Sequence, residues 1–218
     1  MKHPIFSILT YRFRVIFLLI LTSIQVAAQA GWEKKWLHRL ADGRTTGKNN
    51  FYGTVSDMNA PITLALPMGW IAIGLIDKNS TRTEEGLKWL AAQLVNGGVT
   101  FMIKAAVNRP RPAVADPTLI ALEDARIHSF PSGHTSSAFA LATSVSLDHP
   151  KWYVIAPAYL YASLVAYSRC YLGVHYPSDV LAGAALGTAS AWITHRGVDW
   201  IRNASHKKKN QLKLAHVY

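Results

Sequence analysis

Long apolar stretches constrain this chain more than any other feature of its sequence. Residues 60–76 carry no charged side chain. Further apolar stretches lie at 86–103, 131–147, 152–167 and 180–194. Each could cross, or nearly cross, the apolar interior of a bilayer as a helix. With an N-terminal segment added, the sequence predicts an all-α, membrane-embedded bundle of about six helices.

Composition favours a membrane protein and leaves one alternative open. Hydrophobic residues make up 50% of the 218 residues and charged residues only 16%, more apolar material than a soluble core needs. The mean hydropathy of +0.12 is nevertheless low for a protein with several membrane spans. The stretch 86–103 also contains Lys88, Gln93 and Asn96, which must face other helices. A soluble, exported helical domain therefore stays as the alternative.

Residues 1–30 have the pattern of an export signal. A basic front precedes an apolar run, and small residues close the segment at Ala28 and Ala30. The segment is either a cleaved signal peptide or a retained first transmembrane helix, and both would carry the chain after residue 30 to the far side of the membrane. We expect one domain over residues 31–203 and a basic tail over 204–218.

The start of that domain combines an amphipathic helix with a polar connection. Trp32, Trp36, Leu37 and Leu40 fall on one helical face, as in a helix that lies at a membrane interface or packs on a core. Glycines and polar residues follow over 43–59, and they predict a loop. This helix and loop thus precede the most strongly apolar stretch.

The charge balance points to an anionic partner. The formal net charge is +11, which suits nucleic acid, a membrane surface or an anionic substrate. No nucleic-acid motif accompanies it, so we expect no nucleic-acid partner. Cys170 is the only cysteine, which excludes an intramolecular disulfide, and no Cys and His cluster has metal-site spacing. We expect neither a metal nor a cofactor, and the sequence does not indicate an oligomeric state.

A polar turn, Pro131 to His134, leads into one of the apolar stretches. Ser132 suits the N-cap position, where its side chain accepts a hydrogen bond from the first helical turn. The free backbone N–H groups of a helix start bind anions, and Gly133 lets another backbone come close. His134 lies where it could pass a proton to a bound anion. The turn therefore predicts an anion-binding site with an acid or base beside it.

Fixed cations flank the turn at the ends of the neighbouring apolar stretches. Lys104 ends one stretch and Arg169 another. Arg109 and Arg111 follow Lys104, and each precedes a proline. These ends lie on the same side of the predicted bundle, so the cations can meet at one pocket. Lys104, Arg111 and Arg169, with a helix N-terminus, match the charge of a five-coordinate phosphoryl group and need no metal ion.

His175 and Asp179 form a further pair of reactive groups beside Arg169. Pro177 suits the first turn of a helix, so His175 lies just before that helix and Asp179 can reach back to it. A carboxylate on one ring nitrogen fixes the imidazole tautomer and leaves the other nitrogen free to attack. The spacing therefore predicts a nucleophilic histidine that an aspartate orients.

Taken together, these groups resemble the signature of the type 2 phosphatidic acid phosphatase superfamily. That signature reads Lys-x6-Arg-Pro, Pro-Ser-Gly-His and Ser-Arg-x5-His-x3-Asp, and all of its parts occur between Lys104 and Asp179. The family also includes bacterial class A acid phosphatases and vanadium haloperoxidases. The spacing of the first part selects Arg111 and leaves Arg109 as either a helper or a decoy.

The resemblance implies a role for each matched residue. His175 would form a phosphohistidine, Asp179 would orient it, and His134 would protonate the leaving oxygen. The residues that the resemblance assigns to phosphate binding are Lys104, Arg111, Ser132, Gly133 and Arg169. The implied enzyme is a metal-independent membrane lipid phosphatase that acts on a phosphomonoester or diphosphate.

Candidate substrates, by the same resemblance, are undecaprenyl diphosphate, lipid A phosphate, and phosphatidate or phosphatidylglycerol phosphate. A soluble, exported acid phosphatase of broad specificity is the alternative, and a vanadate-dependent haloperoxidase is a remote one. The loop over 112–131 carries Asp116, Glu123 and Asp124. It either helps to select the substrate or is a solvated connector.

Charge distribution predicts an orientation in a bacterial inner membrane. The positive-inside tendency and the basic residues 207–209 place both chain ends in the cytoplasm. The turns before His134 and after Tyr167 then lie outside, where the active site would face the periplasm or exterior. Lys34, Lys35 and Arg39 would also lie outside, which weakens the argument without reversing it.

Overall fold

A computed structural model describes residues 31–123 and 128–215, with side chains up to residue 205. All regular elements within these ranges are helices. They are α2 (Gly31–Asp42), α3 (Thr46–Asp57), α4 (Asn59–Ile76), α5 (Ser80–Val107), α6 (Pro112–Ala115), α7 (Gly133–Asp148), α8 (Trp152–Tyr171) and α9 (Pro177–Ala215). The predicted signal or first transmembrane helix at 1–30, Asp124, and the side chains of residues 207–209 lie outside the described residues.

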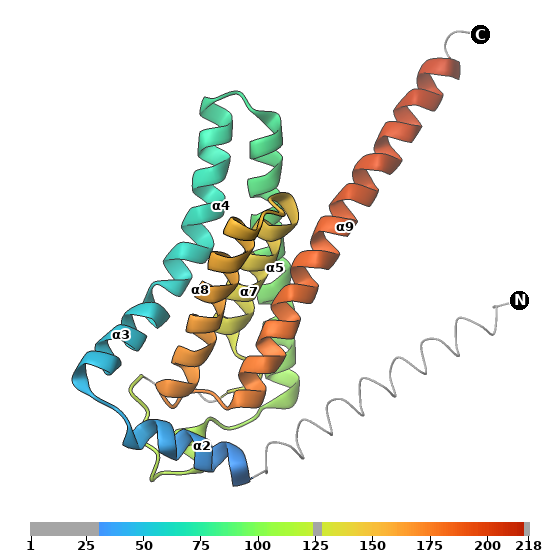
Figure 1. The fold of residues 1–218 in the computed structure, drawn as a ribbon. Coiled ribbons are helices and arrows are strands. Elements are labelled where there is room, and N and C mark those ends of the chain that lie inside the picture. The colour runs from blue at the N-terminus through green and yellow to red at the C-terminus, as the bar shows by residue number, and fades with distance from the viewer. Residues whose placement is uncertain (1–30, 124–127, 216–218) are drawn as a thin grey trace, which may run out of the picture.

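Helix α7 lies at the centre of the bundle. It packs against α9, α8 and α5, while α4 pairs with α5 as a hairpin (Figure 1). Helix α2 lies across the end of the bundle at which α8 ends and α9 begins, and the C-terminal part of α9 extends beyond the bundle at the opposite end. The ends of α5 and α8 and the starts of α7 and α9 therefore meet beside α2.

Helix α3 replaces the loop predicted over 43–59, and that prediction was wrong. The side chain of Thr45 caps the helix by accepting a hydrogen bond from the Lys48 N–H at 3.4 Å. Tyr52 and Val55 pack against buried clusters that include side chains of α8. A glycine weakens a helix by only about 1 kcal/mol. Packing against α8 therefore outweighs the local preference of the glycines for a loop.

Two helices are longer than the apolar residues indicated. Helix α5 begins at Ser80, where Asn79 caps it by accepting a hydrogen bond from the Arg82 N–H at 3.1 Å. Helix α9 begins at Pro177, as predicted for this proline, but it continues through Ala215. Polar residues end an apolar pattern without ending a helix, so hydropathy alone understates helix length.

Polar residues within α5 face other helices, as the sequence predicted. Lys88 is 9% exposed and forms ion pairs with Glu84 and Asp199, each at 3.2 Å. Gln93 and Asn96 donate hydrogen bonds to α7. A buried polar or charged group costs free energy unless it is paired, and these contacts supply the partners.

Small residues let α7 and α9 approach closely near their first turns. A Cβ atom at Gly187 would clash with the Ser136 carbonyl oxygen, and one at Gly183 would lie 2.7 Å from that of Ser132. Close helix packing in membranes relies on such small residues. The two glycines thereby hold the start of α7 against the start of α9.

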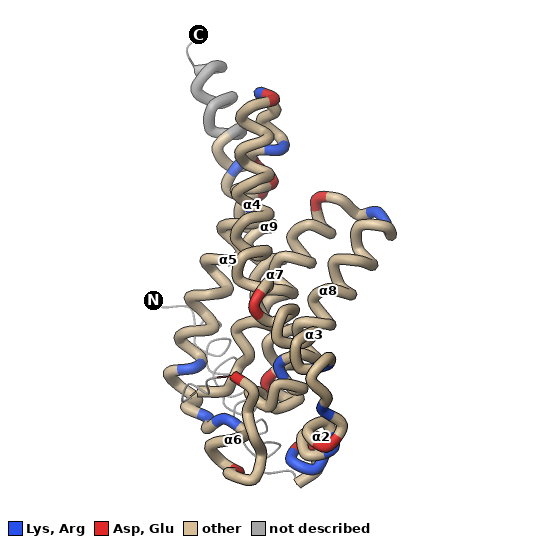
Figure 2. The backbone as a smooth tube through the Cα atoms, turned by 90° about the vertical axis from the view of Figure 1, so that its left-hand side faces the viewer, with Lys and Arg blue, Asp and Glu red and all other residues tan. Residues whose placement is uncertain are grey.

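Two segments of the described chain are long and apolar enough to cross a membrane. They are Thr46–Ile76, which joins α3 and α4, and Ser80–Val107, which is α5. Figure 2 shows most of the Lys, Arg, Asp and Glu toward the ends of the bundle, with α4 free of them. Large apolar side chains on these helices are exposed, among them Leu64, Leu94 and Phe101. A bilayer would cover such a surface.

Candidate active site

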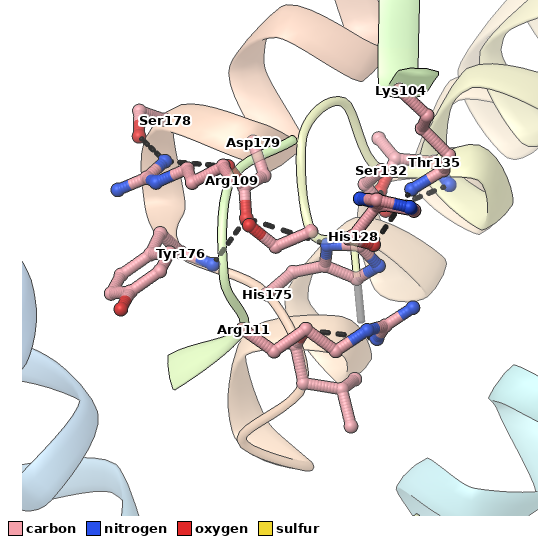
Figure 3. Close-up of polar contacts among 12 residues, drawn as sticks. Lys104, Arg109, Arg111, His128, Ser132, Thr135, His175, Tyr176, Ser178 and Asp179 are labelled. Atoms are coloured by element: carbon pink, nitrogen blue, oxygen red, sulfur yellow. Dashed lines mark hydrogen bonds and ion pairs between the residues drawn. The ribbon is translucent and has the colours of Figure 1, made fainter. Parts of the chain in front are cut away.

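The residues predicted for the site come together at the end of the bundle beside α2. Each lies at a helix end or in a loop that joins two helices there. Lys104 is in the last turn of α5, Arg111 precedes α6, Ser132, Gly133 and His134 start α7, Arg169 is in the last turn of α8, His175 follows it, and Asp179 is in the first turn of α9. In Figure 3 the His175 ring lies among Lys104, Arg111, Ser132 and Asp179.

His175 and Asp179 lie against each other in a buried position. Their side chains are 2% and 0% exposed, and His175 Nδ1 lies 3.4 Å from Asp179 Oδ2. The same carboxylate oxygen accepts a hydrogen bond from the Tyr176 N–H at 2.9 Å. The backbone N–H of His175 donates to the Arg169 carbonyl oxygen at 3.2 Å, which holds the loop between α8 and α9 in place. Because Nδ1 faces the carboxylate, Nε2 is the ring nitrogen left for another contact.

Burial lowers the pKa of the His175 imidazole to about 3. Removal from water penalises the charged form of the ring, and the positive charges of Arg169 and Arg111 add to that effect. The carboxylate of Asp179 opposes it. The ring is therefore neutral near pH 7 and carries the lone pair that a nucleophile needs.

The start of α7 has the cap that the sequence predicts. Ser132 Oγ accepts hydrogen bonds from the Thr135 N–H at 3.4 Å and from the Thr135 hydroxyl at 2.9 Å. The Ser132 N–H donates to the Asp179 carbonyl oxygen at 3.0 Å, which ties this turn to α9. Gly133, expected to allow a close backbone approach, instead has room, because a Cβ there would meet Thr100 at 3.9 Å. The close approach occurs at the α9 glycines.

Lys104 and Arg111 are held by backbone groups of neighbouring loops. Lys104 Nζ donates a hydrogen bond to the His128 carbonyl oxygen at 3.2 Å. Arg111 Nη1 donates to the Val174 carbonyl oxygen at 3.0 Å. The first contact fixes a cation near the turn that leads into α7, and the second fixes one beside the loop that carries His175.

Arg169 contacts two side chains that the sequence did not assign to it. Its guanidinium donates to the Ser56 hydroxyl of α3 and to Glu123 Oε2, the latter at 2.7 Å. Glu123 belongs to the loop over 112–131, so that loop contributes to the site. Arg169 thus pairs with a carboxylate of the chain itself, and its role in phosphate binding stays a prediction.

The charges of these cations reach both histidines. Arg169 and Arg111 act electrostatically on His134 as well as on His175, and Lys104 acts on His134. The same arginines therefore lie within electrostatic range of both histidines. In the parts of the chain that the structure describes, no group of three His, Cys, Asp or Glu side chains is placed to hold a metal ion.

Behind Asp179 lies a buried network that the sequence did not predict. Arg109, which the signature left as a helper or a decoy, donates to Asp179 Oδ1 at 2.5 Å and to Glu33 Oε2 at 2.9 Å. A single glutamate in an amphipathic helix resembles any surface residue. The one signal was spacing, because Glu33 lies four residues before Leu37 and hence on the face of α2 that is buried.

The site lies within a stretch that matches a known family. A sequence profile described as the PAP2 superfamily matches residues 85–203, more than half of the 218 residues. The chain belongs to the PAP2 superfamily. The resemblance of its signature to that of the type 2 phosphatidic acid phosphatases is thereby confirmed, while the roles of individual residues stay predictions.

Curated PAP2 relatives include proteins named for lipid substrates. Undecaprenyl-diphosphatase from Sulfolobus acidocaldarius is 37% identical over 100 residues, which are 46% of this chain and 47% of that protein. Lipid A 1-phosphatase from Porphyromonas gingivalis is 28% identical over 147 residues, which are 66% of this chain and 31% of that protein. The matches thus span less than half the length of either relative.

Solved PAP2 structures share the fold. LpxE from Aquifex aeolicus matches with a TM-score of 0.64 and 27% identity, over 74% of this chain and 93% of that one. A transmembrane PAP2-type phosphatidylglycerolphosphate phosphatase from Bacillus subtilis matches with a TM-score of 0.69 and 25% identity, over 87% of this chain and 94% of that one. The all-helical, membrane-embedded fold predicted from the apolar stretches is therefore confirmed.

Acid should destabilise this PAP2 protein through His175. The unfolded chain binds a proton near the ordinary histidine pKa of 6.5, whereas the folded chain binds it only near pH 3. Between these values the unfolded state binds more protons, so stability falls as the pH falls. We expect the melting temperature in detergent to drop more on acidification for the wild type than for His175→Gln. An equal drop in both proteins would contradict this expectation.

Proposed function

We propose that this protein is a metal-independent phosphatase that hydrolyses a phosphomonoester or diphosphate of a membrane lipid. The observation that carries the proposal is the buried pair of His175 and Asp179, together with arginines whose charges act on both His175 and His134. The names of the relatives favour a lipid as the substrate. Candidates are undecaprenyl diphosphate, lipid A phosphate, phosphatidate and phosphatidylglycerol phosphate.

In the first step His175 attacks the phosphorus atom. A bond forms between Nε2 and phosphorus while the bond from phosphorus to the leaving oxygen breaks. Asp179, which lies against Nδ1, stabilises the positive charge that the ring gains. His134 donates a proton to the leaving oxygen. The lipid departs as an alcohol, or as a monophosphate when the substrate is a diphosphate.

In the second step water cleaves the phosphohistidine. The water oxygen forms a bond with phosphorus while the bond to Nε2 breaks. His134, now neutral, takes the proton that the water loses, as microscopic reversibility requires of the group that gave one in the first step. Inorganic phosphate leaves, His175 is again neutral, and His134 is again protonated. The cycle consumes one water molecule and needs no other reactant.

Fixed positive charge lowers the barrier to both steps. Lys104, Arg111, Arg169 and the start of α7 surround the place where the phosphoryl oxygens gather negative charge. Backbone carbonyl groups and Glu123 hold these cations before a substrate binds. Little reorganisation is then needed on binding, although the phosphate must displace Glu123 from Arg169.

An apolar groove next to His134 suits the lipid chain. The groove has a volume of about 340 Å³ and lies between α4, α5 and the start of α7. Its polar lining is Asn59, Thr63, Gln93, His134 and Ser137, and its apolar lining includes Ala60, Leu64, Leu90 and Leu94. Leu94 is 72% exposed, so the groove opens on the side of the bundle that a bilayer would cover. A lipid could keep its chain there while its phosphate reaches the cations.

We place the active site at the periplasmic or outer face of a bacterial inner membrane, in a protein with several spans. Helix α9 starts at the active-site end, and its basic C-terminal tail extends at the other end (Figure 1), which agrees with the positive-inside tendency. Labelling of Lys34→Cys by a membrane-impermeant maleimide in intact cells tests this, since Cys170 is buried. Reaction only after lysis would place the site inside.

Phosphate release by the purified protein tests the activity. In detergent and excess EDTA we expect release from at least one candidate lipid. The His175→Ala variant should be slower by a factor of about a thousand or more, because the nucleophile is lost. His38→Ala, at a side chain that is 40% exposed, is the matched control and should keep the wild-type rate.

Other outcomes of that assay point elsewhere. Equal or faster release from a water-soluble aryl phosphate would favour the broad-specificity acid phosphatase. Full activity in His175→Ala would refute the phosphohistidine mechanism. Folded protein that releases phosphate from no substrate would refute the phosphatase itself.

A bulky side chain in the groove should separate lipid from soluble substrates. Ala60→Trp places an indole in the apolar lining, so we expect a rise of about tenfold or more in KM for a long-chain phosphatidate. The KM for an aryl phosphate should stay within about twofold. Ala72→Trp, at an exposed position farther along α4, is the control. An equal loss on both substrates would show that the groove does not select the lipid chain.

A further inference from the structure

Three buried charged side chains connect the site to helix α2. Asp179 Oδ1 accepts a hydrogen bond from Arg109 Nη1 at 2.5 Å, and Arg109 Nη2 donates to Glu33 Oε2 at 2.9 Å. The side chains of Glu33 and Asp179 are 0% exposed, and that of Arg109 is 6% exposed. Removing one partner from such a set leaves an uncompensated buried charge. The three side chains therefore hold one another in place.

The first turn of α9 completes this network. The Ser178 N–H donates to Glu33 Oε1 at 2.9 Å, and the Ser178 hydroxyl accepts from Arg109 Nη1 at 2.7 Å (Figure 3 shows the second contact). The Arg109 guanidinium also lies over the Tyr176 ring, 3.8 Å from its centroid. Glu33 thus uses one oxygen to bind Arg109 and the other to bind the turn that carries Asp179.

The net charge of Glu33, Arg109 and Asp179 determines how strongly this group attracts a positively charged His175 ring. Arg109 by itself would neutralise Asp179, and a neutral ion pair attracts a positive ring only weakly. Glu33 restores a net negative charge to the group. That charge matters because the ring becomes positive when it carries the phosphoryl group, while Arg169 and Arg111 also face it with positive charge.

We propose that Glu33 and Arg109 are positioning residues for Asp179, and that helix α2 is thereby part of the active site. Arg109 holds Oδ1, which leaves Oδ2 directed at the His175 ring, and Glu33 balances the charge of Arg109. Neither residue belongs to the signature between Lys104 and Asp179 that assigned the other roles. The inference rests on the proposed phosphohistidine mechanism.

Glu33→Gln tests the inference because it removes the charge and keeps the shape. We expect kcat for phosphatidate in detergent micelles to fall about tenfold or more, as when supporting groups of an active site are lost. KM should stay within about twofold because the phosphate-binding cations are unchanged. Glu85→Gln is the matched control. Glu85 accepts a hydrogen bond from Trp70 Nε1 at 2.8 Å toward the opposite end of α5, and its variant should keep kcat.

A double variant distinguishes charge balance from structural support. Glu33→Gln combined with Arg109→Gln restores the net negative charge beside His175, so its kcat should exceed that of Glu33→Gln alone. A merely structural network predicts a further fall instead. If Glu33→Gln does not fold, Arg109→Lys carries the test. The lysine keeps the positive charge but lacks the planar guanidinium group that binds Asp179 and Glu33 together. The kcat of Arg109→Lys should therefore fall as that of Glu33→Gln does.

The outcomes separate this inference from the proposed function. A Glu33→Gln variant with a kcat within about twofold of the wild type overturns the inference while the wild-type activity stands. So does a double variant that is less active than the single one, or an Arg109→Lys variant with unchanged kcat. Folded wild-type protein without activity on any lipid overturns the proposed function and the inference with it.

Discussion

The site depends on keeping a negative charge buried beside an imidazole ring. Asp179 is fully buried, and a carboxylate in such a place is stable only if strong hydrogen-bond donors meet its oxygens. The Tyr176 N–H meets one oxygen and Arg109 meets the other. The first donor lies in the loop before α9 and the second in the loop after α5. The Asp179 carboxylate thereby holds the loop before α9 against the loop after α5. Arg109 also binds Glu33, so α2 is held in place by the same group.

Helix packing brings the remaining groups to that carboxylate. Close contact at Gly183 and Gly187 sets α7 against α9, and the hydrogen bond from Ser132 to the Asp179 carbonyl joins their first turns. Where a bilayer covers the outer surfaces of α4 and α5, these surfaces must be apolar. Polar and charged side chains are therefore found at the helix ends. The proposed phosphate pocket is built from helix ends and would lie near the depth of lipid headgroups. This arrangement suits the proposed substrate, a lipid whose chain stays in the apolar region.

Local signals predicted the positions of reactive residues better than the lengths of helices. Ser132 and Pro177 act within a single turn, so the starts of α7 and α9 are where the sequence placed them. Thr45 caps the start of α3, but the glycines and polar residues inside the helix favour a loop, and packing against α8 makes the segment helical. Spacing also separated Arg111 from Arg109. The structure gives them different surroundings, one beside the His175 loop and the other behind Asp179.

Residue types and their spacing were sufficient to identify a helical membrane fold and the histidines, aspartate and cations of the candidate site. Hydrophobic patterning, helix caps and short motifs act over a few neighbouring residues, and the chain displays them directly. Glu33 and Glu123 could be assigned only from the packed fold. In the sequence a buried carboxylate looks the same as a solvated one, and what separates them is the partner that distant segments bring. Arg109 forms an ion pair with Glu33 of α2, which is far away in the chain. Arg169 forms one with Glu123 of a loop. Packing of the whole bundle brings these segments together.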